Sequence, residues 1–145
     1  MRLKAWHVPV RLATGAFILN SGLTKQRADA EQAARLHDFA TSAFPQIADL
    51  DPETFATLLS TGEIALGTAL LTPFVPSGLA GLALAGFSGG LTRLYWTAPG
   101  LRQSGSVRPT QQGIPIAKDT WLLAIGLALV LDAVLDRLPG RRRHR

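Results

Sequence analysis

The sequence predicts an all-α integral membrane protein built as a bundle of four transmembrane helices. Of its 145 residues 47% are hydrophobic and only 17% are charged, and the mean hydropathy is +0.19, which is too apolar for an ordinary soluble domain of this length. Long apolar segments also recur along the chain, and a helix needs about 20 such residues to cross the hydrocarbon core. We place these segments in a single domain at residues 8–23, 55–74, 77–95 and 116–135.

Segment 8–23 is the shortest of these and contains Arg11. It must therefore include flanking residues, or the Arg11 side chain must extend to the lipid headgroups. Basic Arg2 and Lys4 precede the segment, which is also typical of a cleaved signal peptide. The segment ends in "NSGLTK", however, and not in a small-residue cleavage site, so we interpret it as a permanent helix.

Segment 55–74 begins after a strong helix-start signal, Asp51-Pro52-Glu53. An acidic N-cap, a proline at the first helical position and a second acid all favour the positive end of a helix. The stretch "TPFVPSG" then places two prolines before segment 77–95. This pattern predicts a short turn that makes the two helices antiparallel neighbours.

Segment 77–95 has small residues at every fourth position, at Ser77, Gly81, Ala85 and Gly89. Small side chains on one stripe allow helix backbones to approach closely, which drives helix association in lipid. We interpret the stripe as a structural packing face inside the bundle rather than as a homodimer contact.

The two longer connections differ in pattern. In connection 24–54, apolar residues recur at helical spacing from Ala33 to Ala43, which predicts an amphipathic helix on the outer surface before Pro45. Connection 96–115 is rich in Gly, Pro and Ser without either period, so we expect a loop there.

Basic residues gather near both termini, and connection 24–54 has more acids than bases up to Asp51. The positive-inside rule therefore places both termini in the cytoplasm, although Arg102 and Arg108 in connection 96–115 oppose this orientation. We interpret the basic tail 136–145 as a contact for membrane lipids. It has no interleaved aromatic residues and no accompanying binding fold, so we expect no nucleic-acid partner.

Glu63 lies inside the apolar stretch "LLSTGEIALGTALL", about eight residues or ~12 Å below the outer end of its segment. A charged acid near the bilayer midplane costs about 2.5–3.5 kcal/mol on insertion scales, so Glu63 should face the bundle and be protonated or paired. Other polar residues lie toward the same outer side, which predicts a polar pocket that opens outward with Glu63 at its floor. They are Asn20, Lys25, Arg93, Lys118 and Asp119. The alternative is a structural buried ion pair with interfacial cations around it.

The stretches "RLATGAFILNSGLTK", "GEIALGTALL" and "KDTWLLAIGLALVL" resemble the DoxX family of small four-helix bacterial membrane proteins. The resemblance covers nearly all of the chain except connection 24–54 and the basic tail. The positions that match the family pattern are Arg11, Lys25, Glu63, Lys118 and Asp119. The resemblance implies a bacterial cytoplasmic membrane protein that partners quinone-linked or thiol-linked oxidoreductases.

The residue inventory limits which redox groups the chain itself can hold. It has no cysteine, so any thiol chemistry belongs to a partner. Its histidines, His7, His37 and His144, are too far apart in the pattern to ligate a haem, and no spacing predicts a metal site or a nucleotide motif. We therefore expect no intrinsic cofactor, with a quinone possible in the Glu63 pocket, where Glu63 exchanges a proton.

From the sequence we expect an accessory or anchoring subunit of a membrane oxidoreductase assembly, held by membrane-protein partners and more a non-catalytic subunit than an enzyme. Two alternatives stay open. The first is a small proton- or cation-coupled transporter, because a midplane acid suits such proteins equally well. The second is a scaffold or assembly factor that binds no ligand.

Overall fold

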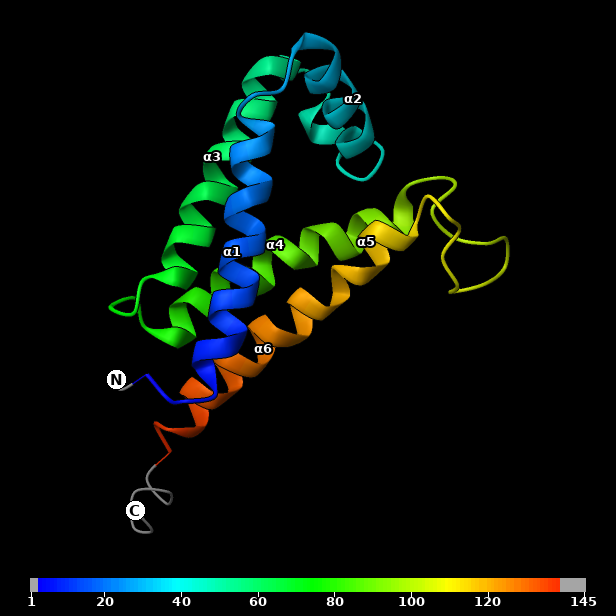
Figure 1. Ribbon diagram of the computed structural model, residues 1–145. Coiled ribbons are helices and arrows are strands. Elements are labelled where there is room, and N and C mark those ends of the chain that lie inside the picture. The colour runs from blue at the N-terminus through cyan, green and yellow to red at the C-terminus, as the bar shows by residue number, and fades with distance from the viewer. Residues whose placement is uncertain (1–2, 139–145) are drawn as a thin grey trace.

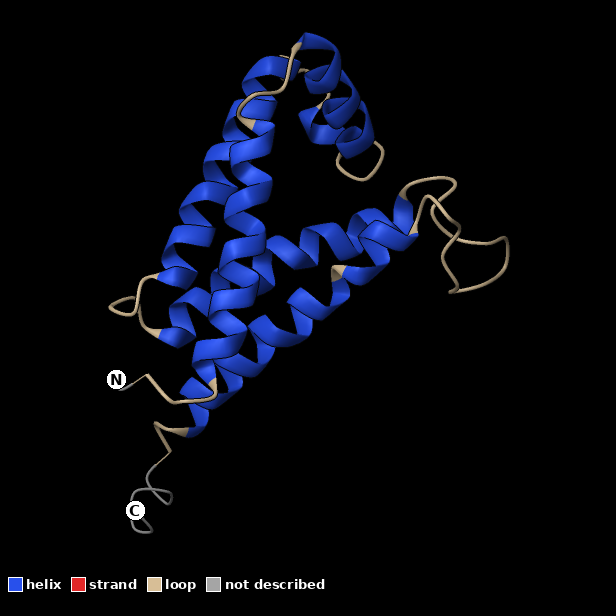
Figure 2. Ribbon diagram, viewed as in Figure 1, coloured by secondary structure: helices blue, strands red, loops and turns tan. Residues whose placement is uncertain are grey.

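The computed structural model describes residues 3–138, and the regular elements in this range are helices (Figure 1, Figure 2). The all-α prediction is confirmed for this part of the chain. The elements are α1 (His7–Lys25), α2 (Ala30–Thr41), the 3₁₀ turn η1 (Pro45–Ile47), α3 (Pro52–Leu71), α4 (Ser77–Thr97), α5 (Ile114–Lys118) and α6 (Thr120–Leu135). Most of the predicted basic tail, residues 139–145, lies outside the described residues.

Within residues 3–138, two helical stretches are long and apolar enough to cross a membrane. They are Pro52–Leu71 and Ile114–Leu135, the second of which includes both α5 and α6. Helices α1 and α4 have similar lengths, 19 and 21 residues, but do not meet the same standard of length and composition. Helices are present at the four predicted places, whereas the prediction that all four of them cross a membrane remains a proposal.

The start of α3 follows the predicted signal. The Asp51 carboxylate accepts a hydrogen bond of 2.8 Å from the Thr54 backbone N–H, and Pro52 occupies the first turn. This backbone hydrogen bond holds the pKa of Asp51 below its ordinary value. At the other end, α3 stops at Leu71 and Phe74 lies in the turn, so the predicted end at residue 74 is wrong because the chain leaves the helix before Pro73.

The predicted amphipathic helix in connection 24–54 is confirmed as α2, which begins where Asp29 accepts a hydrogen bond from the Gln32 backbone N–H. The expected loop after α4 is also present over residues 98–113, and the Tyr95 hydroxyl ties it to α4 by donating to the Val107 carbonyl at 2.7 Å. Segment 116–135 differs from the prediction of one continuous helix. It is broken at Asp119 into α5 and α6.

Four of the helices pack as two tight pairs, α1 against α3 and α4 against α6. In the first pair, a Cβ atom added to Gly67 would lie 2.6 Å from the Leu19 backbone nitrogen. In the second pair, a Cβ atom at Gly81 would lie 2.6 Å from Leu129 Cβ and 2.8 Å from the Gly126 carbonyl oxygen. Both pairs thus use glycine for backbone contact.

This pairing corrects two details of the sequence analysis. The turn at residues 72–76 does join α3 to α4, but the main packing partner of each helix is elsewhere. The stripe on α4 also divides. Gly81 and Ala85 lie against α6, where a Cβ at Gly126 would approach the Ala85 nitrogen to 2.7 Å, whereas Gly89 faces open space with no atom within 4 Å of an added Cβ.

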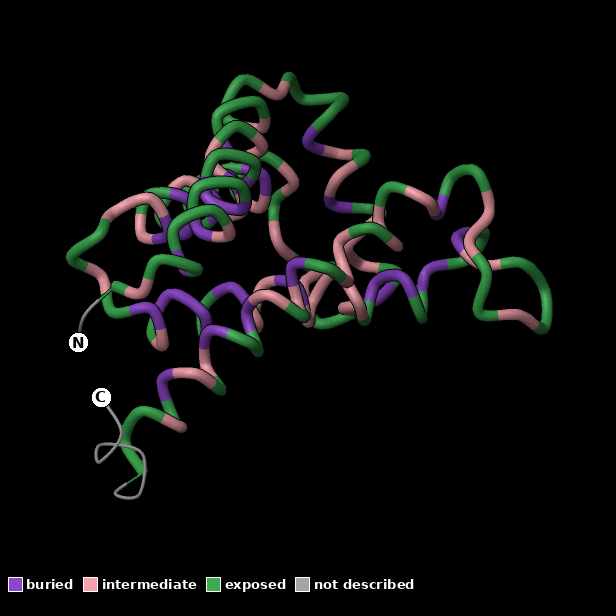
Figure 3. The backbone as a smooth tube through the Cα atoms, turned by 60° about the horizontal axis from the view of Figure 1, so that its bottom comes forward, coloured by how far each residue is buried: buried purple, intermediate pink, exposed green. Residues whose placement is uncertain are grey.

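The two pairs meet at one end and diverge toward the other (Figure 1). The near end carries the start and finish of the described chain and the turn 72–76, and the far end carries α2 and the loop 98–113. Buried residues concentrate where helices face one another, and exposed residues lie on the outward sides (Figure 3). At the junction of the pairs, a core joins α1, α3, α4 and α6, consisting of Ile18, Leu66, Leu70, Ala80, Leu84 and Leu122.

Arg11 joins helices at the near end. Of the two alternatives for segment 8–23, the helix includes flanking residues, since α1 runs from His7 to Lys25, and Arg11 does not extend to the headgroups. Its side chain is buried, with only 3% of the residue exposed. All five of its N–H donors are used: four go to backbone carbonyls at the end of α3 and in the following turn, and one goes to the Ser77 hydroxyl at the start of α4. The guanidinium therefore satisfies carbonyls that the end of a helix leaves without partners.

The glycine contacts predict unequal effects of two substitutions in α4. Gly81→Leu places a large side chain where α4 and α6 backbones meet, and overpacking of this kind costs about 1–3 kcal/mol or more. Gly89→Leu is the matched control because it enters open space. Thermal unfolding in mild detergent should show a clear loss of Tm for Gly81→Leu alone, and equal Tm values would contradict the packing described.

The Arg11 contacts predict that lysine cannot replace it. Lysine has three donors on one nitrogen in place of five on a planar fork, so Arg11→Lys leaves at least two hydrogen-bond acceptors unserved. Each buried acceptor without a donor costs about 1–3 kcal/mol. Arg27→Lys, at an exposed position after α1, is the control. Comparable denaturation midpoints for the two variants would show that the charge alone suffices at position 11.

Candidate functional site

A pocket of about 490 Å³ lies between the two helix pairs, where they diverge. Residues from α1, α2, α3, α4, α5 and α6 line it. Its wall is mainly apolar, and five of the six phenylalanines of the chain contribute to it, namely Phe17, Phe39, Phe44, Phe55 and Phe87. This size and lining are typical of pockets for small molecules, which combine apolar walls with a few polar groups.

Three ionisable side chains line this pocket: Lys25, Glu63 and Asp119. Lys25 Nζ lies 2.9 Å from each of the two carboxylate oxygens of Glu63 and donates a further hydrogen bond of 2.6 Å to the Ser21 hydroxyl. The Glu63 side chain is 4% exposed, compared with 23% for Lys25. Glu63 is thus a buried carboxylate whose charge is compensated by one partly exposed ammonium group.

Helix geometry explains why the last residue of α1 reaches an acid in the middle of α3. Glu63 follows Pro52 by eleven residues, or about 17 Å of helix, and precedes Leu71 by about 12 Å. Side chains on a helix point toward its N-terminus, so Lys25 extends back along α1 to Ser21. Gly22 allows the necessary approach, because a Cβ there would lie 2.9 Å from the Ile64 nitrogen in α3.

The break between α5 and α6 brings Asp119 to the same pocket. Asp119 separates Lys118, the last residue of α5, from Thr120, the first residue of α6. Its carboxyl group interacts electrostatically with Lys25, favourably, and with Glu63, unfavourably. Two carboxyl groups and one ammonium therefore face the same apolar space, which is an arrangement suited to proton exchange.

Lys25 has no donor to spare for a ligand. Its three N–H bonds are directed to Ser21 and the two oxygens of Glu63. A ligand oxygen in the pocket therefore meets Asp119 and the remaining acceptor capacity of Glu63. In its protonated form Asp119 can donate a hydrogen bond to such an oxygen.

The structure brings Lys25, Glu63 and Asp119 together and places the other residues of the predicted set outside this pocket. Asn20, Arg93 and Lys118 are exposed and do not line this pocket. Arg93 instead places its guanidinium carbon 4.9 Å from the centre of the Phe44 ring, which forms part of the pocket wall. These residues belong to helices that line the pocket or lie next to residues that do, but their side chains are on other faces. The sequence pattern did not resolve which face of its helix each residue occupies.

The arrangement of the His, Asp and Glu side chains also bears on metal and haem binding. Within residues 3–138, no group of three or more His, Asp or Glu side chains could hold a metal ion. His7 and His37 belong to opposite ends of the bundle, and His144 lies outside the described residues.

No protein-family model, curated protein or solved structure matches the chain. The resemblance to the DoxX family therefore stays a prediction, and the function must be argued from the pocket.

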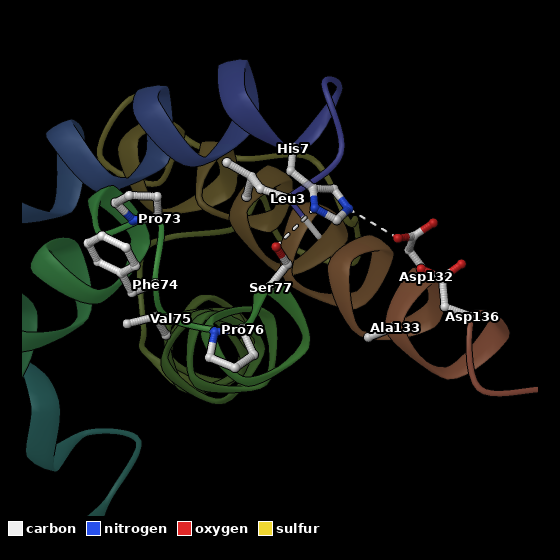
Figure 4. Close-up of a pocket in the computed structure, with 10 residues that line it drawn as sticks. All are labelled: Leu3, His7, Pro73, Phe74, Val75, Pro76, Ser77, Asp132, Ala133 and Asp136. Carbon is white, nitrogen blue, oxygen red and sulfur yellow. Dashed lines mark hydrogen bonds and ion pairs between the residues drawn. The ribbon is translucent and has the colours of Figure 1, made fainter. Parts of the chain in front are cut away.

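One polar cluster was not predicted (Figure 4). His7 Nδ1 lies 2.9 Å from the Ser77 hydroxyl, and His7 Nε2 lies 3.1 Å from the Asp132 carboxylate. The Lys4 backbone N–H donates to Nδ1 at 3.4 Å, so Nδ1 is an acceptor that also receives the Ser77 hydroxyl hydrogen, and the ring donates from Nε2 to Asp132. Lys4 Nζ completes the cluster at 2.6 Å from Asp132, and hydrogen bonds to Asp132 and Asp136 raise the Lys4 pKa.

This near-end cluster joins α1, α4 and α6 and has every polar partner supplied from within the protein. It borders a small pocket of about 100 Å³. The only signal in the sequence was the presence of polar residues at helix ends. His7 and Asp132 are 125 positions apart, so no local spacing could pair them.

The ion pair in the main pocket predicts a specific pattern of coupling. Lys25→Met should be strongly destabilising, by about 3–5 kcal/mol, because it leaves the buried Glu63 charge without a partner. Glu63→Gln removes that charge, so the double variant should recover part of the loss. Denaturation of the wild type, both single variants and the double variant checks this, and strictly additive losses would mean that the two side chains do not interact in solution.

Proposed function

We propose that the chain is a DoxX-like membrane protein that serves as an accessory subunit of a membrane oxidoreductase assembly and binds a quinone between its helix pairs. The observation that carries the proposal is the pocket of about 490 Å³, which combines phenylalanine walls with the Lys25–Glu63 pair and Asp119. Phenylalanine faces stack on a flat ring, and carboxyl groups can exchange protons with ring oxygens.

Insertion of α1, α3, α4 and α5–α6 into a bacterial cytoplasmic membrane is part of the proposal. Supporting it, large apolar side chains that line no described pocket are exposed on these helices, including Leu12, Leu58, Leu82 and Leu131. An aqueous protein rarely leaves so many such side chains without cover. The two helical stretches that are long and apolar enough to cross a membrane point the same way.

The proposed orientation places the near end, with both termini, in the cytoplasm. The described chain begins and finishes at the same end (Figure 1), as expected for an even number of crossings. Basic residues flank α1 and follow α6, and the positive-inside rule assigns such ends to the cytoplasm. The far end, with α2 and the loop 98–113, then lies on the opposite side of the membrane.

The role of the chain in the assembly follows from what its residues can and cannot supply. The sequence has no cysteine, so electrons must come from a partner rather than from a thiol of this chain. The pocket residues supply binding and proton exchange: Phe87 and its aromatic neighbours hold the ring, and Asp119 and Glu63 hold or move a proton. The chemistry of electron transfer belongs to the quinone and the partner enzyme.

Two glycines of α4 give a matched test of quinone binding. Gly86 lines the pocket and Gly89 does not, and both have no atom within 4 Å of an added Cβ. Gly86→Phe fills the pocket and should weaken binding of a short-chain quinone analogue at least about tenfold, whereas Gly89→Phe should leave the affinity within about twofold. Binding is measured with the purified full-length protein in detergent, by titration or photolabelling.

Other outcomes of this test would overturn the proposal. If the wild type binds no quinone, or if Gly86→Phe binds as well as Gly89→Phe, the pocket is not a quinone site. Proton-coupled uptake of a substrate by proteoliposomes would then favour the transporter. Copurification with a redox enzyme in the absence of quinone would favour a ligand-free scaffold.

A further inference from the structure

A second, polar pocket of about 240 Å³ shares Lys25 with the phenylalanine-lined pocket described above, which we call the phenylalanine pocket. It is formed by the end of α1, the start of α2 and the first part of α3. These segments lie at the far end of the bundle (Figure 1). Its polar lining residues are Lys25, Gln26, Glu53, Thr57 and Ser60.

Lys25 is the one ionisable side chain that lines both pockets among the described residues. Lys25 therefore borders both the polar space at the far end and the apolar space that contains Glu63. Glu63 lines only the apolar pocket and its side chain is 4% exposed, whereas the Lys25 side chain is 23% exposed. Lys25, which is hydrogen-bonded to Glu63, is thus the side chain that connects Glu63 to the polar pocket.

We infer that the polar pocket is the aqueous entrance to the Lys25–Glu63 pair, and that it admits protons from the side of the membrane opposite the termini. The inference rests on the membrane insertion proposed above. One proton passes from Lys25 Nζ to a Glu63 carboxylate oxygen and on to an oxygen of the ligand. Lys25 Nζ then takes a proton from water in the polar pocket, so each transfer moves one proton and no electron.

The chemistry of the two pockets supports this division of roles. Water occupies a cavity that offers it several hydrogen-bonding partners, as Gln26, Glu53 and Thr57 do. The phenylalanine pocket offers few such partners, and a bound ligand excludes water from it. Water in the polar pocket can therefore supply protons to the Lys25–Glu63 pair, whereas the apolar walls of the phenylalanine pocket supply none.

Two buried serines provide a matched test. Ser60 in α3 and Ser88 in α4 are 1% and 0% exposed, and each hydroxyl donates to a carbonyl of its own helix, Thr57 and Leu84 respectively. Only Ser60 lines the polar pocket, and Ser88 lines none of the pockets described for residues 3–138. The chain has no cysteine, so Ser60→Cys and Ser88→Cys each carry a single thiol.

The experiment measures modification of these thiols in sealed vesicles of known orientation by a membrane-impermeant trimethylammonium methanethiosulfonate. Ala30→Cys, at the exposed start of α2, reports which side the far end faces. We expect Ser60→Cys to react from the same side as Ala30→Cys and at least about tenfold faster than Ser88→Cys. Reaction no faster than that of Ser88→Cys, or reaction only from the other side, would overturn the inference.

These readouts separate the inference from the proposed function. Labelling of Ser60→Cys does not depend on a bound quinone, so failure of the quinone titration leaves the entrance intact. A protein that alkaline carbonate removes from the vesicles is not inserted, and that outcome overturns the membrane proposal itself.

Discussion

The arrangement of the helices depends on the five hydrogen bonds of Arg11. They join α1 to the end of α3, to the turn 72–76 and to the first residue of α4, so one side chain fixes the place where the two helix pairs meet. A guanidinium can do this because its donors lie in a rigid plane and its charge is permanent. The buried carbonyls also compensate part of the cost of burying that charge. Among residues 3–138, no side chain makes a comparable set of hydrogen bonds between the pairs at the far end, and the main pocket forms there.

The tight pairs and the open space between them have one origin. Glycines allow backbone contact within each pair, at Gly67 in α3 and at Gly81 with Gly126 in the other pair. Between the pairs, larger side chains such as Phe17 and Phe87 keep the helices apart and line the space that results. The distribution of small and large residues thus decides both where helices associate and where a ligand fits.

Hydrophobic pattern and end signals were sufficient to predict the helices, because those features are local. Asp51 and Pro52 mark the start of α3, and the apolar repeat near Ala33 marks α2. Grouping the polar residues of one side of the bundle also proved informative, since Lys25 and Glu63, which were predicted to share a pocket, form an ion pair. Which face a residue occupies depends on tertiary packing, and for that reason Asn20 and Lys118 were misplaced. The break at Asp119 was likewise not predicted, because no glycine or proline lies there and an isolated Asp inside an apolar segment is a weak helix-start signal.

If a helix pair rotates about the near end, the displacement of its far end is proportional to the length of its helices. Helix α4 has 21 residues and is therefore about 31 Å long, so each degree of rotation about the near end moves its far end by about 0.5 Å. A rotation of a few degrees changes the width of the pocket mouth by more than one ångström while the contacts at Arg11 hardly move. At the far end, residues of α2 and of the loop 98–113, such as Phe39 and Leu101, pack in one apolar core with the end of α4, so this core limits any such rotation and with it the width of the pocket mouth.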